Sequence, residues 1–259
     1  MKKITIIGSD ARYDYAAREL ERLGFDVITR ADSGSDAVLI PINQRGGVIK
    51  TQHVDVLLSE VARICSRAVF FGGAENDDIR RALGDRRFFD ITQNAEFAEE
   101  NAELTAEGAL GIIIDKMPFS VRGAKVHVLG YGRVGRATTN ALVSLGALVT
   151  VFARSDAARE AAGKTCNTRD FSCFDVDFDC LINTVPTRVL KSAAVRQIGD
   201  CSYVIELASA PGGFDDDDIS SLGARYINAP GLPGKTSPAS AGKIMAKAIY
   251  DIIKGEENK

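Results

Sequence analysis

The segment from Ala124 to Arg136 constrains the fold of this chain more than any other. An apolar run there leads into the turn Gly130-Tyr131-Gly132-Arg133-Val134-Gly135. This glycine spacing is that of a dinucleotide-binding turn. Gly130 lets the chain leave the strand sharply, Gly132 lets the backbone approach a pyrophosphate, and Gly135 lets the next helix pack closely on the sheet. The sequence therefore predicts a strand, a phosphate-binding turn and a helix whose first amides face the phosphates.

The residues after the turn support this interpretation. Apolar residues recur at helical spacing until Gly146, namely Val134, Ala137, Ala141, Leu142 and Leu145. A second strand, Leu148 to Ala153, follows. The strand–helix–strand unit has the expected size and favours a bound dinucleotide over a purely structural turn.

The end of the second strand indicates which dinucleotide is bound. NAD enzymes usually place an acidic residue there, whereas this chain has Arg154 and Ser155. A guanidinium can pair with a 2′-phosphate, and a serine hydroxyl can add a hydrogen bond. We expect NADP(H), and the neighbouring Asp156 keeps NAD open as an alternative.

The alternation of strands and helices predicts an α/β protein with two Rossmann-like, doubly wound parallel-sheet domains joined by a long helix. We expect a flavodoxin- or Rossmann-like substrate domain over residues 1–100, a connecting helix over 101–120 and the NAD(P)-binding Rossmann domain over 121–235. Residues 236–259 are expected to form a C-terminal helix, which in two-domain dehydrogenases often folds back across the cleft. In the first half, the expected elements are strands 4–7, 27–29, 37–40, 68–71 and 88–90 and helices 13–23, 54–64 and 77–83. In the second half, after the second strand, they are helices 157–163 and 190–198, strands 179–184, 203–207 and 225–227, and a last helix over 239–254.

Composition excludes several classes of protein. The 259 residues carry a formal net charge of −3, and the basic residues are dispersed, so nothing indicates a surface for polyanions. Ile4–Ile7 is broken at once by Gly8, which is typical of a first strand rather than a signal peptide. Five cysteines without a C-x-x-C favour a reduced intracellular chain, and no apolar run is long enough for a membrane span. We expect a soluble, cytoplasmic protein.

We expect no metal site. Cys180 lies inside an apolar strand and is interpreted as a buried hydrophobe. The four aspartates Asp215 to Asp218 are interpreted as a solvated helix N-terminus. His127 alternates with valines in a strand and is expected in the core, whereas the setting of His53 predicts no role.

Ligands of open α/β sheets bind beyond the carboxyl ends of the strands. That rule selects the segments 8–12, 72–76, 183–188, 208–213 and 229–234. Asn183, Thr184, Val185 and Pro186 are expected to pass beneath the nicotinamide. The turn-rich segments 208–213 and 229–234 are suited to walling a cleft, although ordinary tight turns would have the same composition.

Over nearly its whole length, the chain resembles the A-type protein of dipicolinate synthase, a dehydrogenase-like protein of spore formation. The motifs that carry the resemblance are Ile7-Gly8-Ser9-Asp10-Ala11-Arg12, Thr105-Ala106-Glu107-Gly108, the stretch 128–133, Ala153-Arg154-Ser155, the stretch 182–186, the stretches 207–213 and 229–234, and 238–242. Residues 31–67 depart most from the family pattern and look shorter. The resemblance implies a fold like that of alanine and formate dehydrogenases. It also implies oxidation of dihydrodipicolinate, or its hydroxylated tetrahydro precursor, to pyridine-2,6-dicarboxylate with a flavoprotein-like B subunit.

The residues suit that chemistry. Arg12 can fork onto a substrate carboxylate, and Asp10 and Glu107 are candidates for accepting a proton or orienting Arg12. Thr105 and Ser209 could supply hydrogen bonds to the substrate, and Gly212 and Gly213 are placed in the substrate wall. Each charged residue has a structural alternative: Asp10 as a helix cap, Glu107 as an exposed helix carboxylate, and Arg12 in an interdomain ion pair.

Two other functions stay open. One is a different NAD(P)-dependent two-domain dehydrogenase of an amino or hydroxy acid, although a hydroxy-acid enzyme usually needs a cleft histidine. The other is a non-catalytic module that senses NADP(H) through domain closure. A homodimer is compatible with each of them.

Overall fold

The computed structural model describes residues 2–51 and 53–257, which group into two units. The first unit contains Met1–Asn101 and Ser237–Lys259, and the second contains Ala102–Thr236. The boundary falls within helix α4, Ala95–Lys116. The C-terminal segment therefore belongs to the same unit as the N-terminal strand.

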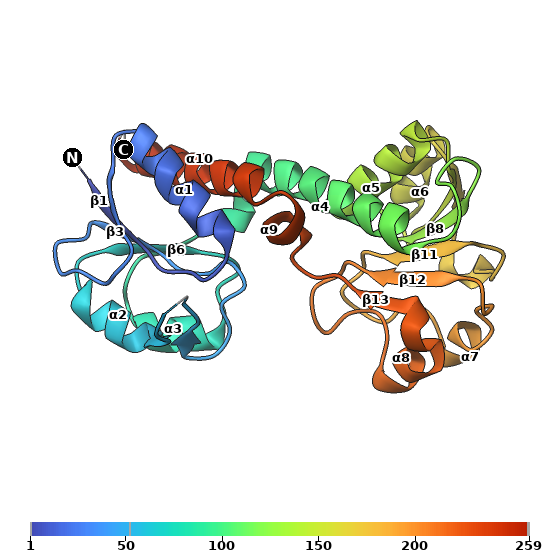
Figure 1. The fold of residues 1–259 in the computed structure, drawn as a ribbon, viewed down its shortest axis with the longest axis horizontal. Coiled ribbons are helices and arrows are strands. Elements are labelled where there is room, and N and C mark those ends of the chain that lie inside the picture. Colours follow the sequence, from blue (N-terminus) through green and yellow to red (C-terminus); the bar gives the residue numbers. More distant parts are fainter. Residues whose placement is uncertain (1, 52, 258–259) are drawn as a thin grey trace. The chain divides into compact units, whose positions relative to one another are not determined.

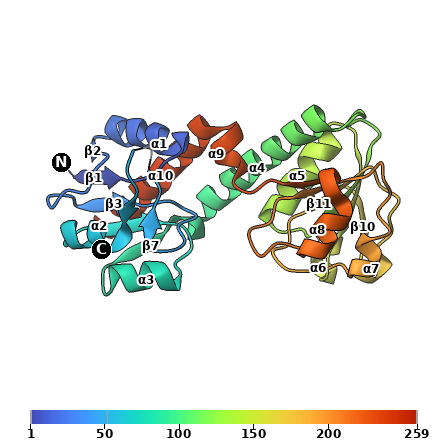
Figure 2. The same cartoon turned by 60° about the horizontal axis from the view of Figure 1, so that its bottom comes forward.

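The first unit is built on a five-stranded parallel sheet with the order β2-β1-β3-β6-β7. Its strands are β1 (Lys3–Ile6), β2 (Asp26–Ile28), β3 (Ala37–Leu39), β6 (Val69–Gly72) and β7 (Phe88–Asp90). Helices α1 (Ala11–Arg22) and α10 (Pro238–Glu257) lie on one side of it, and α2 (Leu58–Ile64) and α3 (Asp77–Leu83) lie on the other (Figures 1 and 2). This strand order is that of flavodoxin-like sheets, in which ligands bind at the carboxyl ends of the strands.

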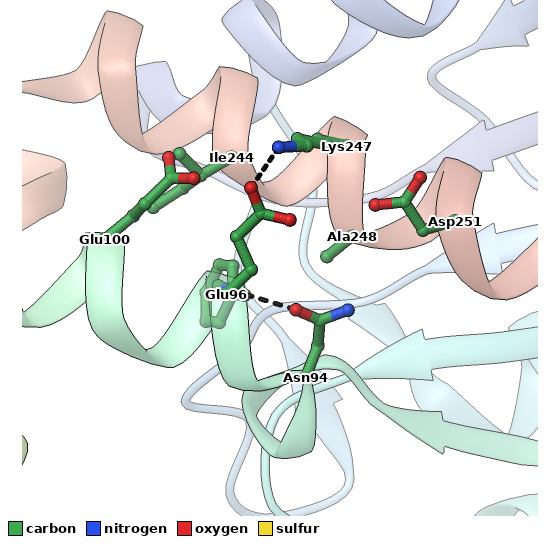
Figure 3. A pocket seen from close by; sticks show the side chains of 8 residues that line it. Asn94, Glu96, Glu100, Ile244, Lys247, Ala248 and Asp251 are labelled. Carbon is green, nitrogen blue, oxygen red and sulfur yellow. Dashed lines mark hydrogen bonds and ion pairs between the residues drawn. The ribbon is translucent and has the colours of Figure 1, made fainter.

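Helix α10 packs directly on α1. A Cβ atom on Gly242 would lie 2.5 Å from the carbonyl oxygen of Arg12 and 2.6 Å from Cβ of Tyr15, so the helices approach each other where α10 has no side chain. Lys247 of α10 forms an ion pair with Glu96 at the start of α4 (Figure 3). The pocket beside this ion pair encloses no room for a bound molecule, so the contact is structural.

The second unit contains a six-stranded parallel sheet with the order β10-β9-β8-β11-β12-β13. Its strands are β8 (Lys125–Leu129), β9 (Leu148–Phe152), β10 (Asn167–Arg169), β11 (Cys180–Asn183), β12 (Tyr203–Glu206) and β13 (Tyr226–Asn228). In order of appearance this is 3-2-1-4-5-6, the arrangement of the Rossmann fold. The expected α/β class with two doubly wound parallel sheets is confirmed.

Both faces of this second sheet are covered. One face packs against α4, α5 (Arg133–Ser144) and α6 (Asp156–Gly163) through Ile113, Leu142 and Ala162. The other packs against α7 (Ser192–Val195) and α8 (Asp216–Leu222) through Val195 and Leu222. His127 points to this second face, where it is 4% exposed, as expected for a core residue.

Some sequence-based expectations are wrong in detail. The helix expected from Val54 begins only at Leu58, because a hairpin of β4 (Val48–Ile49) and β5 (Val56–Leu57) precedes it. The Thr51 hydroxyl donates to the carbonyl of Val54 and accepts from the Val54 amide, and this local turn competes with a helix. Edge strand β10 was not expected, and the helix expected over 190–198 is limited to Ser192–Val195.

Candidate functional site

The turn after β8 owes its shape to missing side chains. Gly130 has a φ of +92°, and a Cβ there would lie 2.7 Å from Cγ2 of Val185 and 2.8 Å from Oγ1 of Thr184. A Cβ on Gly135 would lie 2.3 Å from the carbonyl oxygen of Gly130, so α5 can approach the turn only with glycine there. Gly132, the N-cap of α5, faces open space instead. The turn is therefore closed toward the sheet and open at Gly132, as a backbone cradle for a pyrophosphate requires.

The neighbouring loop after β11 supports this turn. The Thr184 hydroxyl donates to the carbonyl of Leu129 at 2.7 Å, and the Thr184 amide donates to the same carbonyl. Val185 contacts the Gly130 position, as the Cβ distance above shows. Pro186 follows in the same exposed loop. The structure thus brings the glycine turn and the 183–186 loop together at the carboxyl end of the sheet.

The end of β9 carries two basic residues and a carboxylate close together, Arg154, Arg159 and Asp156. Arg154 is exposed, and Ser155 caps α6 by accepting a hydrogen bond from the Ala158 amide at 3.2 Å. Asp156 forms an ion pair with Arg159. The nearby carboxylate that would favour NAD is therefore engaged by an arginine of its own helix, whereas Arg154 is exposed at the strand end.

The segment 208–213 forms the next loop of the second unit. It contains a cis peptide bond between Ala210 and Pro211, and Ser209 is exposed. Gly212 has a φ of +81°, and a Cβ on Gly213 would lie 2.4 Å from Nδ2 of Asn183. The end of β11 and the loop after β12 therefore touch each other at Asn183 and Gly213.

A buried carboxylate that was not expected from the sequence lies between these two loops. Glu206, the last residue of β12, is 3% exposed and accepts hydrogen bonds from the Asn183 side chain and from the amides of Ala208 and Gly213. Burial raises the pKa of Glu206, and these hydrogen bonds act in the opposite direction. The signal in the sequence that could have revealed this buried carboxylate is an acidic residue within the apolar stretch 203–207.

The first unit holds Asp10 and Arg12 in contact. Asp10 caps α1 by accepting a hydrogen bond from the Arg12 amide. Its carboxylate also accepts hydrogen bonds from Nε and Nη2 of the Arg12 side chain, at 2.9 and 2.7 Å. Asp10 is therefore the helix cap that was the structural alternative for it, and it also forms an ion pair with Arg12. The fork leaves Nη1 of the guanidinium as a donor for another carboxylate.

A cavity of about 310 Å³ opens in the first unit at the carboxyl ends of β1 and β2, and neither Asp10 nor Arg12 is among its lining residues. Apolar residues such as Ile6 and Val61 line it together with Thr29, Arg30 and His53. The ring of Tyr13 lies on Gly8 at its edge, and the Tyr13 hydroxyl accepts a hydrogen bond from the Ile42 amide. Burial raises the pKa of Tyr13 to about 12, so its phenol stays neutral near pH 7.

The remaining predicted site residues lie on α4 in the second unit. Thr105 is buried, whereas the Glu107 carboxylate is exposed. Between them and the loop 229–234, Gly108 allows a close approach, since a Cβ there would lie 2.8 Å from Cβ of Leu232 in α9 (Leu232–Thr236). Asp10 and Arg12 thus belong to the first unit, and Thr105, Glu107 and the loop residues belong to the second.

The aspartate run is more than a solvated helix end. Asp215 caps α8, as expected, but the Asp218 side chain is 1% exposed and pairs with Nη2 of Arg188 at 2.5 Å. The expectation of four solvated carboxylates is therefore wrong for Asp218, because an arginine from the 184–190 loop neutralises it. Among residues 2–51 and 53–257, no group of three potential ligands could hold a metal ion, and no helix is long and apolar enough to cross a membrane.

Comparison with known proteins gives a consistent relationship. No family model matches the chain. The A-type protein of the Bacillus subtilis dipicolinate synthase is 28% identical over 292 aligned positions, covering 99% of this chain and 98% of the relative.

Solved structures agree. The A-type protein of dipicolinate synthase from Bacillus halodurans superposes with a TM-score of 0.86 at 26% identity, over 97% of each chain. Its counterpart from Bacillus subtilis gives 0.86 at 25% identity, over 99% of this chain and 97% of that one. At 13% identity, the NAD-dependent formate dehydrogenase from Staphylococcus aureus shares the fold, with a TM-score of 0.65 over 99% of this chain and 95% of that one. The chain is thus a relative of the A-type protein of dipicolinate synthase over nearly its whole length, with the two-domain architecture of the dehydrogenases.

Proposed function

We propose that this chain is the dehydrogenase-like component of a dipicolinate synthase. The observation that carries the proposal is the similarity to that component over 99% of the chain, including the glycine turn. The substrate would be dihydrodipicolinate or its hydroxylated tetrahydro precursor, and the product pyridine-2,6-dicarboxylate. A flavoprotein B subunit is the proposed partner, and sporulation in the cytoplasm the proposed setting.

The residues of the turn fit a nicotinamide dinucleotide. Gly130, Gly132 and Gly135 would hold the pyrophosphate with the backbone of Tyr131, Arg133 and Val134, because the loop is open at Gly132 and closed at the other two glycines. Arg154 and Ser155 would bind the 2′-phosphate, and this favours NADP over NAD. When bound, NADP+ supplies the hydride acceptor.

Oxidation of dihydrodipicolinate removes a hydride from one ring carbon and a proton from its neighbour, and the ring becomes aromatic. The protein has to hold the substrate and accept the proton. Arg12 would bind a carboxylate through Nη1, with Asp10 orienting it. Asp10 is already engaged by Arg12, so the exposed Glu107 is the better proton acceptor. Thr105 and Ser209 would add hydrogen bonds, and Gly212 and Gly213 would form part of the wall.

The burial of His127 favours this reaction over oxidation of a hydroxy acid, which usually needs an imidazole base. His127 is buried among phenylalanine rings, with His127 and Phe178 centroids 4.8 Å apart, so it cannot reach a substrate. The second histidine, His53, lies in the hairpin of the first unit. Neither follows a strand of the nucleotide-binding sheet.

The Arg154→Ala variant tests both the reaction and the cofactor. Purified protein receives the precursor and either NADP+ or NAD+, with and without a flavoprotein B subunit, while the ultraviolet absorbance of dipicolinate is followed. We expect product with NADP+. In the variant, loss of the charged pairing with the 2′-phosphate should weaken NADP+ binding by roughly tenfold and leave NAD+ binding nearly unchanged. Equal loss with both cofactors would contradict NADP selectivity, and no product under any condition would contradict the proposed reaction.

A further inference from the structure

The carboxylate of Glu206 has an unusual position. It ends the buried strand β12 between Ile205 and Leu207 and is itself 3% exposed. No ion pair with a lysine, arginine or histidine is found for it in the described part of the chain. A buried carboxylate without a cation is costly, and an apolar residue of similar size would serve the core better.

Hydrogen bonds from two loops compensate for this cost. The Oε1 atom accepts from Nδ2 of Asn183 at 2.8 Å and from the Ala208 amide at 3.0 Å. The Oε2 atom accepts from the Gly213 amide at 2.8 Å and from Nδ2 of Asn183 at 3.1 Å. One side chain therefore joins the loop after β11 to both ends of the loop after β12.

Asn183 extends the connection. Its Nδ2 donates to the carbonyl of Val185 at 3.0 Å, and its Oδ1 accepts from the Val185 amide at 3.1 Å. Val185 in turn contacts the Gly130 position in the glycine turn. A continuous set of contacts thus runs from Gly213 through Glu206 and Asn183 to the turn.

The space around the carboxylate is filled by the loop backbone. A Cβ on Gly212 would lie 3.1 Å from Oε2 of Glu206, and one on Gly213 would lie 2.4 Å from Nδ2 of Asn183. The loop can fold onto the carboxylate because both positions are glycine. The two glycines at 212 and 213 are therefore what allows the loop backbone to pack against the Glu206 carboxylate.

We propose that Glu206 is a positioning residue for the reaction: it fixes the loops 183–186 and 208–213 relative to each other and to the glycine turn. This inference rests on the proposed function, together with the expectation that the loop 183–186 lies beneath the nicotinamide and the loop 208–213 in the substrate wall. Glu206 itself touches neither, since its carboxylate is buried. It acts through Asn183 and the amides of Ala208 and Gly213.

The test compares Glu206→Gln with the control Glu160→Gln, an exposed residue of α6. A carboxamide at 206 keeps the size but turns an NH₂ group toward at least one of the donors, so one loop loses its acceptor. We expect kcat with NADP+ and the precursor to fall by about 10- to 100-fold, because small displacements of the reacting groups have effects of this size. The Kd of NADPH should change by less than about threefold, since the turn does not contact residue 206 directly. A purely structural role of Glu206 would lower the folding stability without lowering kcat more than it changes the Kd of NADPH.

Hydrogen–deuterium exchange of the unliganded protein gives a second readout. The amides of Ala208 and Gly213 should exchange faster in Glu206→Gln, while the Thr184 amide, which is bonded to Leu129, should not change. If Glu206→Gln does not fold, Glu206→Asp serves instead, because it keeps the charge but cannot reach both loops. Unchanged exchange at both amides, or a kcat equal to that of the wild type, would overturn the role of Glu206 while leaving the proposed function intact. A wild-type protein without turnover would overturn both.

Discussion

At the scale of single residues, the glycine turn after β8 depends on the absence of side-chain atoms. The Gly135 position faces the carbonyl oxygen of Gly130, and Gly132 faces open space. These positions follow from the G-x-G-x-x-G spacing, because steric demands of a strand–turn–helix unit are local. The sequence could therefore predict the shape of this turn.

Replacing Gly135 with alanine should separate α5 from the turn. The new Cβ would lie 2.3 Å from the Gly130 carbonyl oxygen, so the backbone must move. We expect a loss of about 1–3 kcal/mol in stability and at least about tenfold weaker NADPH binding, measured by fluorescence titration. Gly111→Ala is the control: it is also a helical glycine, but with nothing within 4 Å of its Cβ. Equal NADPH affinity in both variants would contradict the assigned role of the turn.

Glu206 and Asp218 show where residue-level prediction fails. Each is a carboxylate that the sequence presents as an ordinary polar residue, and each is buried by partners far along the chain. Asn183 is 23 residues before Glu206, and Arg188 is 30 residues before Asp218. Such pairings depend on how strands are ordered in the sheet, which local spacing does not encode.

His127 should make the stability of the protein sensitive to acid. Burial lowers its pKa from the ordinary 6.5, although Asp175, with Oδ1 3.8 Å from Nε2, acts in the opposite direction. Arg169 and Lys125 lower the pKa further, and Asp177 raises it. A lowered pKa in the folded state means that stability is complete above the unfolded value and is lost as the pH falls through the folded value.

The measurement is the melting temperature of wild type and His127→Leu as a function of pH. Between about pH 7.5 and 5, the melting temperature of the wild type should fall by a few degrees more than that of His127→Leu. The reason is that protonation of His127 would place a charge among Phe152, Phe174 and Phe178. Parallel curves for the two proteins would show that His127 does not titrate with unfolding.

At the scale of elements, the first unit depends on the contact between α1 and α10. Helix α1 carries Asp10 and Arg12 at its start, and α10 covers it at Gly242. Strand and helix positions were mostly predictable from periodicity. The hairpin of β4 and β5 was not, because Val54, Leu57 and Leu58 continue an apolar helical pattern that the Thr51 turn interrupts.

Gly242→Ala should weaken this helix contact. The added Cβ would lie 2.5 Å from the Arg12 carbonyl oxygen, so α10 has to shift away from α1. We expect a loss of about 1–3 kcal/mol in the denaturant unfolding of the first unit. Gly255→Ala, later in the same helix and with nothing within 4 Å, should instead gain up to about 1 kcal/mol from helix propensity. Similar effects at both positions would contradict the close packing at Gly242.

At the scale of the whole molecule, the first unit is built from both ends of the chain. The amphipathic pattern of the last helix predicted that it has a buried face, but such a pattern does not identify the element against which that face packs. The family resemblance extended the prediction from fold to reaction; similarity over 99% of the chain supports the family relationship, and the reaction is our proposal. The proposed function depends above all on hydride transfer from the substrate to NADP+.

The most direct measurement follows the hydrogen that the substrate loses. Precursor deuterated at its sp³ ring carbons is incubated with the protein, NADP+ and the flavoprotein partner, and the reduced nucleotide is analysed by mass spectrometry. We expect deuterated NADPH in an amount equal to that of dipicolinate, and much less of both products with the Gly135→Ala variant when NADP+ is kept below the Kd of the wild type. Dipicolinate formed without deuterated NADPH, or at a rate independent of this protein, would contradict the proposed hydride transfer.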